Sequence, residues 1–108
     1  MKNYLLSILL LFSISYSRAQ TPVLWGLTYG GGANSAGTIF SFNTATNQPV
    51  ANYSFQVDTD GVRPNGTMLE ATDGYFYGTT FQGGKDEEGT IFRYDVTLGA
   101  EKVLYSFT

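Results

Sequence analysis

Carboxylates in two short clusters are the side chains of this sequence best suited to chemistry. In the first cluster, "VDTDG", Asp58 and Asp60 alternate before Gly61, as acids do in a calcium-binding loop. The twelve-residue loop of that type would run from Gln56 to Thr67, so it lacks its first acid and its closing glutamate. We therefore predict no complete metal site. Asp58 and Asp60 are the candidates for a cation, and an Asx-type turn is their alternative use.

The second cluster is a run of three acids, Asp86, Glu87 and Glu88. Such a run can contact a cation, a basic protein or a polar ligand, and carboxylates paired across a cleft can cleave glycosides. The alternative is a solvated loop tip that aids solubility. A related segment earlier in the chain has the uncharged residues 33–36 at the same place. We therefore predict no catalytic role that both segments share.

Two aromatic residues, Trp25 and Tyr77, lie near these loops in the sequence and can contact a ligand by stacking on sugar rings. Aromatic residues in strands also pack across strands or in a core. Both uses of Trp25 and Tyr77 stay open at this point.

The chain contains no His and no Cys. It therefore cannot supply a Ser-His-Asp triad, a cysteine nucleophile or a His/Cys zinc site. We predict no catalytic residues, no cofactor and no enzymatic activity for this segment. Any bound metal would be a hard cation on oxygen ligands.

A glycine-rich frame occurs twice, as "GGANSAGTIF" and "GGKDEEGTIF". Its glycine spacing resembles that of a phosphate-binding loop, G-x-x-x-x-G-K-[ST]. Thr38 stands where that loop requires Lys, and no helical pattern follows. The second copy differs in the same way, so we predict no nucleotide site and interpret the frame as the base of a hairpin.

The two copies of the frame are 52 residues apart, and the repeat needs no gap. Over residues 24–55, eleven positions are identical to their counterparts. The frame itself consists of Gly31, Gly32, Gly37, Thr38, Ile39 and Phe40 in the first copy, and of Gly83, Gly84, Gly89, Thr90, Ile91 and Phe92 in the second. We therefore predict two tandem repeats within residues 20–108, at 24–75 and 76–108, with the second copy cut short.

The elements that must position these residues are strands. "YFYGTTF", "TIFRYDV" and "KVLYSF" are rich in aromatic and β-branched residues, "TMLEAT" is a shorter candidate, and "TDGVRPNG" carries turn residues. Alternation places Ile91 and Arg93 on one face of a strand, and Phe92 and Tyr94 on the other. We predict an all-β fold of antiparallel four-stranded units. The repeat length is typical of a β-propeller blade, so the chain would hold about two blades of an incomplete propeller.

The N-terminus has the layout of a secretory signal peptide: a basic end, an apolar stretch over residues 4–16, and small residues at Ser17 and Ala19. The apolar stretch is shorter than the roughly 20 residues that a membrane-spanning helix needs. We predict a signal-peptide helix in residues 1–19, cleavage after Ala19, and no membrane span in the mature chain. The mature chain would then be secreted or displayed on the outer cell surface.

Residues 20–108 are acidic. Lys2 and Arg18 fall in the signal segment, so the remainder carries four basic and nine acidic side chains, a net charge of −5. Because basic side chains must neutralise phosphates for binding, we predict no nucleic-acid partner.

The segment "DGVRPNGTMLEATDGYF" followed by "YGTTFQGGKDEEGTIFRYD" and "KVLYSF" resembles the GloVer, or Gloeo/Verruco, tandem repeat. That repeat has the form LYGTT-x-x-GG-x(4)-GT[IV]F, V-L-x-x-F, D-G-x-x-P-x-x-x-L and D-G-x-L-Y. The resemblance covers about residues 24–108. The first copy departs from the pattern at Trp25 and Leu27, as terminal repeats often do.

The resemblance implies a secreted or surface-displayed bacterial protein with many such units and a variable C-terminal anchor. It also implies another D-G-x-x-P connector after Thr108, so we expect this chain to be a fragment of a longer repeat protein, with further repeats as its partners. It brings no activity with it. We expect a non-enzymatic scaffold or binding module. The alternatives are part of an extracellular carbohydrate-binding or carbohydrate-active protein, with a glycan or protein partner, and a truncated remnant without function.

Overall fold

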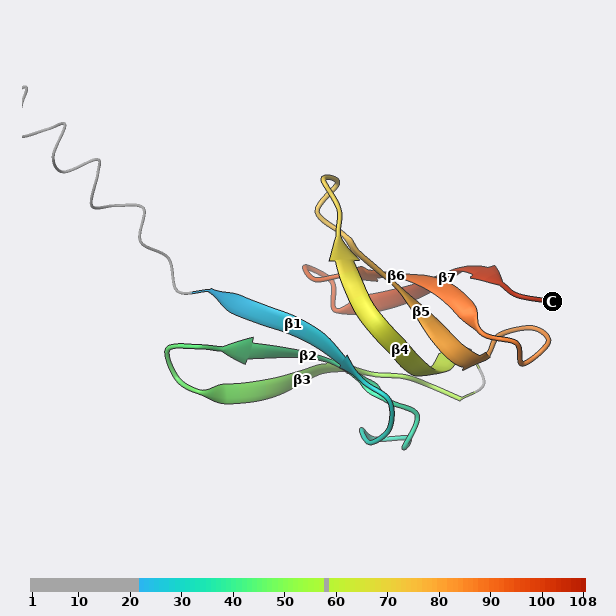
Figure 1. Ribbon diagram of the computed structural model, residues 1–108, viewed down its shortest axis with the longest axis horizontal. Coiled ribbons are helices and arrows are strands. Elements are labelled where there is room, and N and C mark those ends of the chain that lie inside the picture. Colours follow the sequence, from blue (N-terminus) through green and yellow to red (C-terminus); the bar gives the residue numbers. More distant parts are fainter. Residues whose placement is uncertain (1–21, 58) are drawn as a thin grey trace, which may run out of the picture.

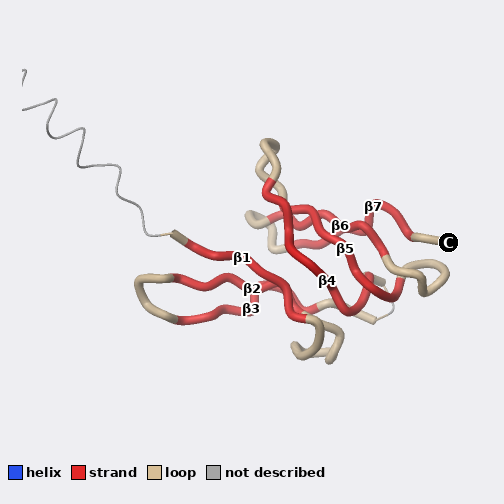
Figure 2. Tube along the Cα trace, viewed as in Figure 1, coloured by secondary structure: helices blue, strands red, loops and turns tan. Residues whose placement is uncertain are grey.

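The computed structural model describes residues 22–57 and 59–108 (Figure 1). These residues form strands and loops and contain no helix, which confirms the all-β prediction. The predicted signal-peptide helix and Asp58 lie outside the described residues. Figure 2 shows strand along most of the described chain, with loops at the strand ends.

The strands form two antiparallel sheets in which neighbours in sequence are neighbours in space. The first sheet contains β1 (Val23–Thr28), β2 (Thr38–Asn43) and β3 (Gln48–Ser54). The second sheet contains β4 (Gly61–Glu70), β5 (Phe76–Gly83), β6 (Thr90–Asp95) and β7 (Ala100–Ser106). Both sheets are therefore meanders joined by hairpin loops.

The strand β6 shows why this sequence forms a sheet. Phe92 and Tyr94 are buried, whereas Ile91 and Arg93 between them are only partly covered. This alternation confirms the predicted division of β6 into two faces. It lets one face pack into a core while the other stays available.

The strand β4 is longer than the sequence indicated. We expected a connector over residues 59–66 because of its Gly, Pro and Asn residues, and that expectation is wrong, since the strand begins at Gly61. β4 is an edge strand of its sheet, which is the position where strands tolerate proline. The register shifts between Asn65 and Leu69, and Gly66 in this interval has φ 85°. The turn residues are thus accommodated as an irregularity within a strand.

The boundaries of the sheets differ from those of the sequence repeat. β4 lies within the first sequence unit, 24–75, but pairs with β5 in the second sheet. The second sheet therefore has the expected four strands, whereas the first has three in the part of the chain that the structure describes. A hydrogen bond from β4 also connects the two sheets. The Arg63 amide donates to the carbonyl of Ala36, in the first glycine loop, at 2.8 Å.

Each sheet has two faces, which the 52-residue repeat relates to one another. Face A carries Trp25, Leu27, Ile39 and Tyr53 in the first sheet, and Tyr77, Thr79, Ile91 and Tyr105 in the second. Face B carries Leu24, Gly26, Phe40 and Phe42 in the first sheet, and Phe76, Gly78, Phe92 and Tyr94 in the second. Equivalent residues thus stand on equivalent faces.

The core lies where face A of the first sheet packs on face B of the second sheet. The Trp25 ring is 5.2 Å from the Phe76 ring between centroids, and the Tyr53 ring is 6.1 Å from that of Tyr94. Phe55, just after β3, packs edge-on against Phe92 at 5.3 Å. Large aromatic rings therefore join the two sheets, in a chain that has no cysteine.

Candidate functional site

The two glycine loops have the same backbone conformation. In the first, Gly31, Gly32 and Gly37 have φ of 84°, 80° and 105°. In the second, the equivalent residues Gly83, Gly84 and Gly89 have φ of 83°, 82° and 97°. Side chains rarely adopt this left-handed region, so glycine is the residue type that fits. The shared part of the frame sets the shape of a hairpin loop.

A pair of threonines closes each loop at its base. The Thr90 amide donates to Thr80 Oγ1 at 3.0 Å, and the two hydroxyls are 2.8 Å apart. In the first sheet the Thr38 amide donates to Thr28 Oγ1 at 3.0 Å, and those hydroxyls are 2.7 Å apart. Equivalent atoms of the two threonine pairs thus close both loops in the same way.

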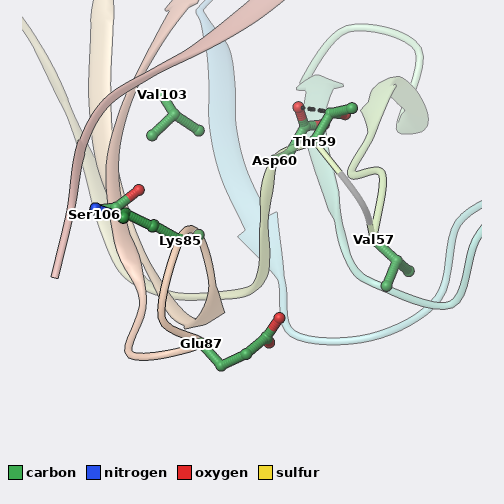
Figure 3. A pocket seen from close by; sticks show the side chains of 8 residues that line it. Val57, Thr59, Asp60, Lys85, Glu87, Val103 and Ser106 are labelled. Atoms are coloured by element: carbon green, nitrogen blue, oxygen red, sulfur yellow. Dashed lines mark hydrogen bonds between the residues drawn. The ribbon is translucent and has the colours of Figure 1, made fainter. Parts of the chain in front are cut away.

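A cavity of about 440 Å³ opens between the segment that leads into β4, the second glycine loop and β7 (Figure 3). It is lined by Val57, Thr59, Asp60, Gly84, Lys85, Glu87, Val103 and Ser106. Its walls therefore carry charges of both signs. The part contributed by Lys85 and Glu87 comes from the loop tip, where the two repeats differ.

Asp60 is the most firmly held acid of this cavity. Its Oδ2 accepts hydrogen bonds from the Tyr53 hydroxyl and from the Gln56 amide, the latter at 3.0 Å. Its Oδ1 accepts from the Thr59 hydroxyl at 3.2 Å. Burial raises the pKa of Tyr53, and the hydrogen bond to Asp60 raises it further. Three donors thus fix Asp60 and, through it, the approach to β4.

Glu101 on β7 is a second acid near Asp60. Both of its carboxylate oxygens are buried and have no hydrogen-bond partner in residues 22–57 and 59–108. Burial raises the pKa of Glu101 to about 9, and the nearby Asp60 contributes to the increase. Glu101 therefore holds its proton at neutral pH and stands between the sheets as a neutral acid.

The sequence pattern of the Gloeobacter/Verrucomicrobia repeat matches residues 14–108. The chain belongs to the Gloeobacter/Verrucomicrobia repeat family. No curated protein and no solved structure matches the chain.

Membership of the Gloeobacter/Verrucomicrobia repeat family confirms the resemblance found in the sequence. The match begins before β1 and runs to the last residue, so it includes both glycine loops. Between the two copies in this chain the loop tips differ, with "ANSA" in one and "KDEE" in the other. The shared residues build the hairpins, and the tips are free to differ.

The structure brings some of the predicted site residues together and separates others. Asp60 and Glu87 line one cavity, while Asp86 and Glu88 are exposed on the same loop and are not part of its lining. Among the described residues no group of three His, Cys, Asp or Glu side chains is placed to hold a metal ion. Asp58, the other cation candidate, lies outside the described residues.

The two aromatic candidates have different surroundings. Trp25 lies on face A in the packed interface, against Phe76 and Tyr94. Tyr77 is its equivalent on the second sheet, and its hydroxyl donates to Asp73 Oδ2 at 2.6 Å. That hydrogen bond lowers the pKa of Asp73 and raises the pKa of Tyr77. Trp25 packs between the two sheets. The face that carries Tyr77 has no sheet packed on it among the described residues.

Sequence reasoning missed Glu101 and the link from Tyr53 to Asp60. Glu101 pairs with Tyr94 and Val103 pairs with Phe92, so both stand on the buried face B, whereas the register shift between Ile91 and Phe92 puts Tyr105 on face A. Pro49 stands at the equivalent position of the first copy. An acid at a face B position was therefore the available signal.

No helix of the described residues is long and apolar enough to cross a membrane.

Proposed function

We propose that this chain is a secreted or cell-surface, β-propeller-like repeat module with a non-enzymatic scaffold or binding role, within a longer array of such repeats. The observation that supports the proposal best is the packing of face A on face B. Several residues of this packing recur 52 positions later, among them Ile39, Tyr53 and Phe55, so the second sheet carries a similar surface on which a further sheet can pack. Membership of a repeat family suggests further repeats of the same kind as partners.

The absence of His and Cys from the sequence supports a non-enzymatic role. The acid best placed in the cavity, Asp60, is held by three donors and anchors a connection between sheets. A carboxylate used in this way is a structural anchor. The binding role would then fall to the loop tips, whose sequences differ between repeats.

The experiment for this proposal is a combined binding and hydrolysis screen on the 108-residue chain. Polysaccharides and peptidoglycan are incubated with the protein, and released reducing ends are measured beside retention on the immobilised glycans. We expect no turnover. A variant with Asp86→Asn, Glu87→Gln and Glu88→Gln serves as the matched control. Turnover that this variant abolishes would overturn the scaffold proposal.

Secretion is tested separately at the N-terminus. We expect the exported chain to begin at Gln20, because Ser17 and Ala19 provide a small-x-small cleavage site. N-terminal sequencing of the protein from the medium or cell envelope gives this residue directly. A chain that keeps Met1 and stays inside the cell would contradict the proposed location.

A second candidate function is supported by the cavity itself. A protein that binds or cleaves carbohydrate needs a polar cleft, and Asp60, Lys85 and Glu87 line such a cleft. In that case the loop acids would act with groups from further repeats. The screen above distinguishes the two functions, since turnover supports this second one.

A further inference from the structure

The interface inside this chain joins two different surfaces. Face A of the first sheet contacts face B of the second, so the contact is head to tail and not two-fold symmetric. It leaves face B of the first sheet and face A of the second without an equivalent cover among residues 22–57 and 59–108. Heterologous contacts of this kind repeat until a ring closes, or continue as a filament.

The uncovered face A presents an aromatic pair that is already buried elsewhere in the molecule. Tyr105 and Phe107 lie 5.2 Å apart, with an interplanar angle of 76°. Their equivalents, Tyr53 and Phe55, lie 5.5 Å apart at 88°. Phe55 is fully buried by the second sheet, whereas Tyr105 is 54% exposed and Phe107 is 41% exposed. The same structure is thus covered in one sheet and open in the other.

The uncovered face B of the first sheet resembles the covered face B of the second sheet. Phe40 lies over Gly26 as Phe92 lies over Gly78, and in both cases a Cβ on the glycine would come 2.6 Å from the ring. Phe92 is fully buried, whereas Phe40 is only partly covered. Leu24 is 57% exposed at the position where Phe76, its equivalent, is 7% exposed. The first sheet therefore carries an unused version of the surface that receives Tyr53 and Phe55.

We propose that these two uncovered faces bind each other between copies of this chain, so that copies stack head to tail. The proposal rests on the stacking module described under Proposed function. Its occupant is a second copy, because each free face is the sequence equivalent of a face that already packs on its counterpart inside one chain. Each copy contributes the two described sheets, so two to four copies would make a ring of about four to eight such sheets.

Two basic side chains stand on the uncovered face A, Arg93 and its cross-strand neighbour Lys102, and Lys102 replaces the apolar Val50 of the first sheet. Arg93 replaces Ser41 there, but its guanidinium lies over the Tyr75 ring, 4.4 Å from the centroid. Within residues 22–57 and 59–108 the first sheet has no strand equivalent to β4, which adds Val62 and Met68 to the contact within the chain. We therefore expect association that is weaker than the internal packing and that depends on concentration.

The test is sedimentation velocity on the 108-residue chain over a concentration series, with one charge placed on each free face. Leu24→Glu alters face B of the first sheet, and Tyr105→Glu alters face A of the second; both side chains are exposed, which favours folding of the variants. We expect each variant alone to raise the dissociation constant more than about tenfold, because the new carboxylate would be buried at the contact. Circular dichroism verifies that both variants keep the β-sheet spectrum.

Mixing the two variants gives the decisive result. Each keeps the face that the other has lost, so an equimolar mixture should form a heterodimer and nothing larger. Leu98→Glu is the matched control, since Leu98 is 76% exposed at a hairpin turn away from both faces. This control should assemble like the unchanged chain.

Three results would overturn the proposal. The unchanged chain could stay monomeric at every concentration, or Leu24→Glu could leave assembly intact, which indicates a symmetric contact through face A alone. Assembly that survives both substitutions would indicate association through another segment, such as apolar residues 4–16, or capture of a different repeat protein. The scaffold proposal fails only if the glycan screen shows turnover, which these sedimentation results do not measure. A failure of stacking is therefore distinct from a failure of the scaffold proposal.

Discussion

The buried hydroxyls of Thr80 and Thr90 lie 2.8 Å apart, and Thr80 Oγ1 also accepts the Thr90 amide. The pair joins β5 to β6 at the base of the second glycine loop. Thr28 and Thr38 make the same contact in the first sheet. In each loop a threonine hydroxyl, and not a backbone carbonyl, is the acceptor for the backbone amide of the facing threonine.

We therefore predict that Thr80→Val destabilises the protein by about 1–3 kcal/mol, because it leaves the buried Thr90 amide without its acceptor. The shape of the side chain is kept, so the change isolates the hydrogen bonds. Denaturant unfolding gives the free energy. Thr79→Val is the control, since Thr79 is an exposed neighbour of the same type. Equal effects of the two substitutions would contradict the assigned role.

The glycine loop gives a second prediction. At Gly89, with φ 97°, an added Cβ would clash with the Thr80 carbonyl oxygen. At Gly74, with φ 87°, an added Cβ meets nothing within 4 Å. Gly74→Ala should cost about 1–2 kcal/mol from its backbone conformation alone. Gly89→Ala should cost clearly more, and a thermal unfolding experiment that ranks them in the opposite order would refute the clash.

The hydrogen bond from Tyr53 to Asp60 gives a third prediction. Tyr53→Phe removes one of the three donors of a buried carboxylate and should cost about 1–3 kcal/mol. Tyr105 is the equivalent residue of the second repeat and is 54% exposed. Tyr105→Phe should change stability by less than about 0.5 kcal/mol, as exposed substitutions usually do. Comparable losses in urea unfolding would show that Asp60 is not the reason.

Glu101 gives a prediction about pH. Its pKa is about 9 in the folded chain and 4.5 as the ordinary value, so the folded state binds the proton more tightly than the unfolded state. The stabilisation is therefore complete below about pH 4.5 and is lost as pH rises toward 9. Glu101→Gln should reduce this dependence, and the exposed Glu88→Gln should not. Urea midpoints at pH 5, 7 and 9 measure it; an unchanged profile in Glu101→Gln would contradict the assignment.

The sequence predicted the elements whose pattern is local. The alternation of Ile91, Phe92, Arg93 and Tyr94 gave the two faces of β6, and the repeat gave the equivalence of the two glycine loops. The first part of β4 was missed because Pro64 and Gly66 are turn residues in isolation, whereas an edge strand accepts them. Local chemistry favoured the turn, and sheet pairing overrode it.

The contacts between sheets could not be predicted from the pattern. Trp25 and Tyr77 occupy equivalent positions, yet only Trp25 packs against another sheet, because the chain places no described sheet on Tyr77. Alternation shows that a strand has two apolar faces, but it does not show which face meets which. Tyr53 and Asp60 likewise meet only after the segment behind β3 turns back.

The central claim is that the two sheets form one stacked unit through face A and face B. Native-state hydrogen exchange on Phe92→Ala tests it most directly, since Phe92 is on the second sheet and is fully buried against the first. We predict that the amides of β2 lose protection together with those of β6, by about 3–5 kcal/mol of opening free energy or by the whole stability if that is smaller. Loss of protection in β6 with β2 unchanged would show that the sheets fold independently and would contradict the account.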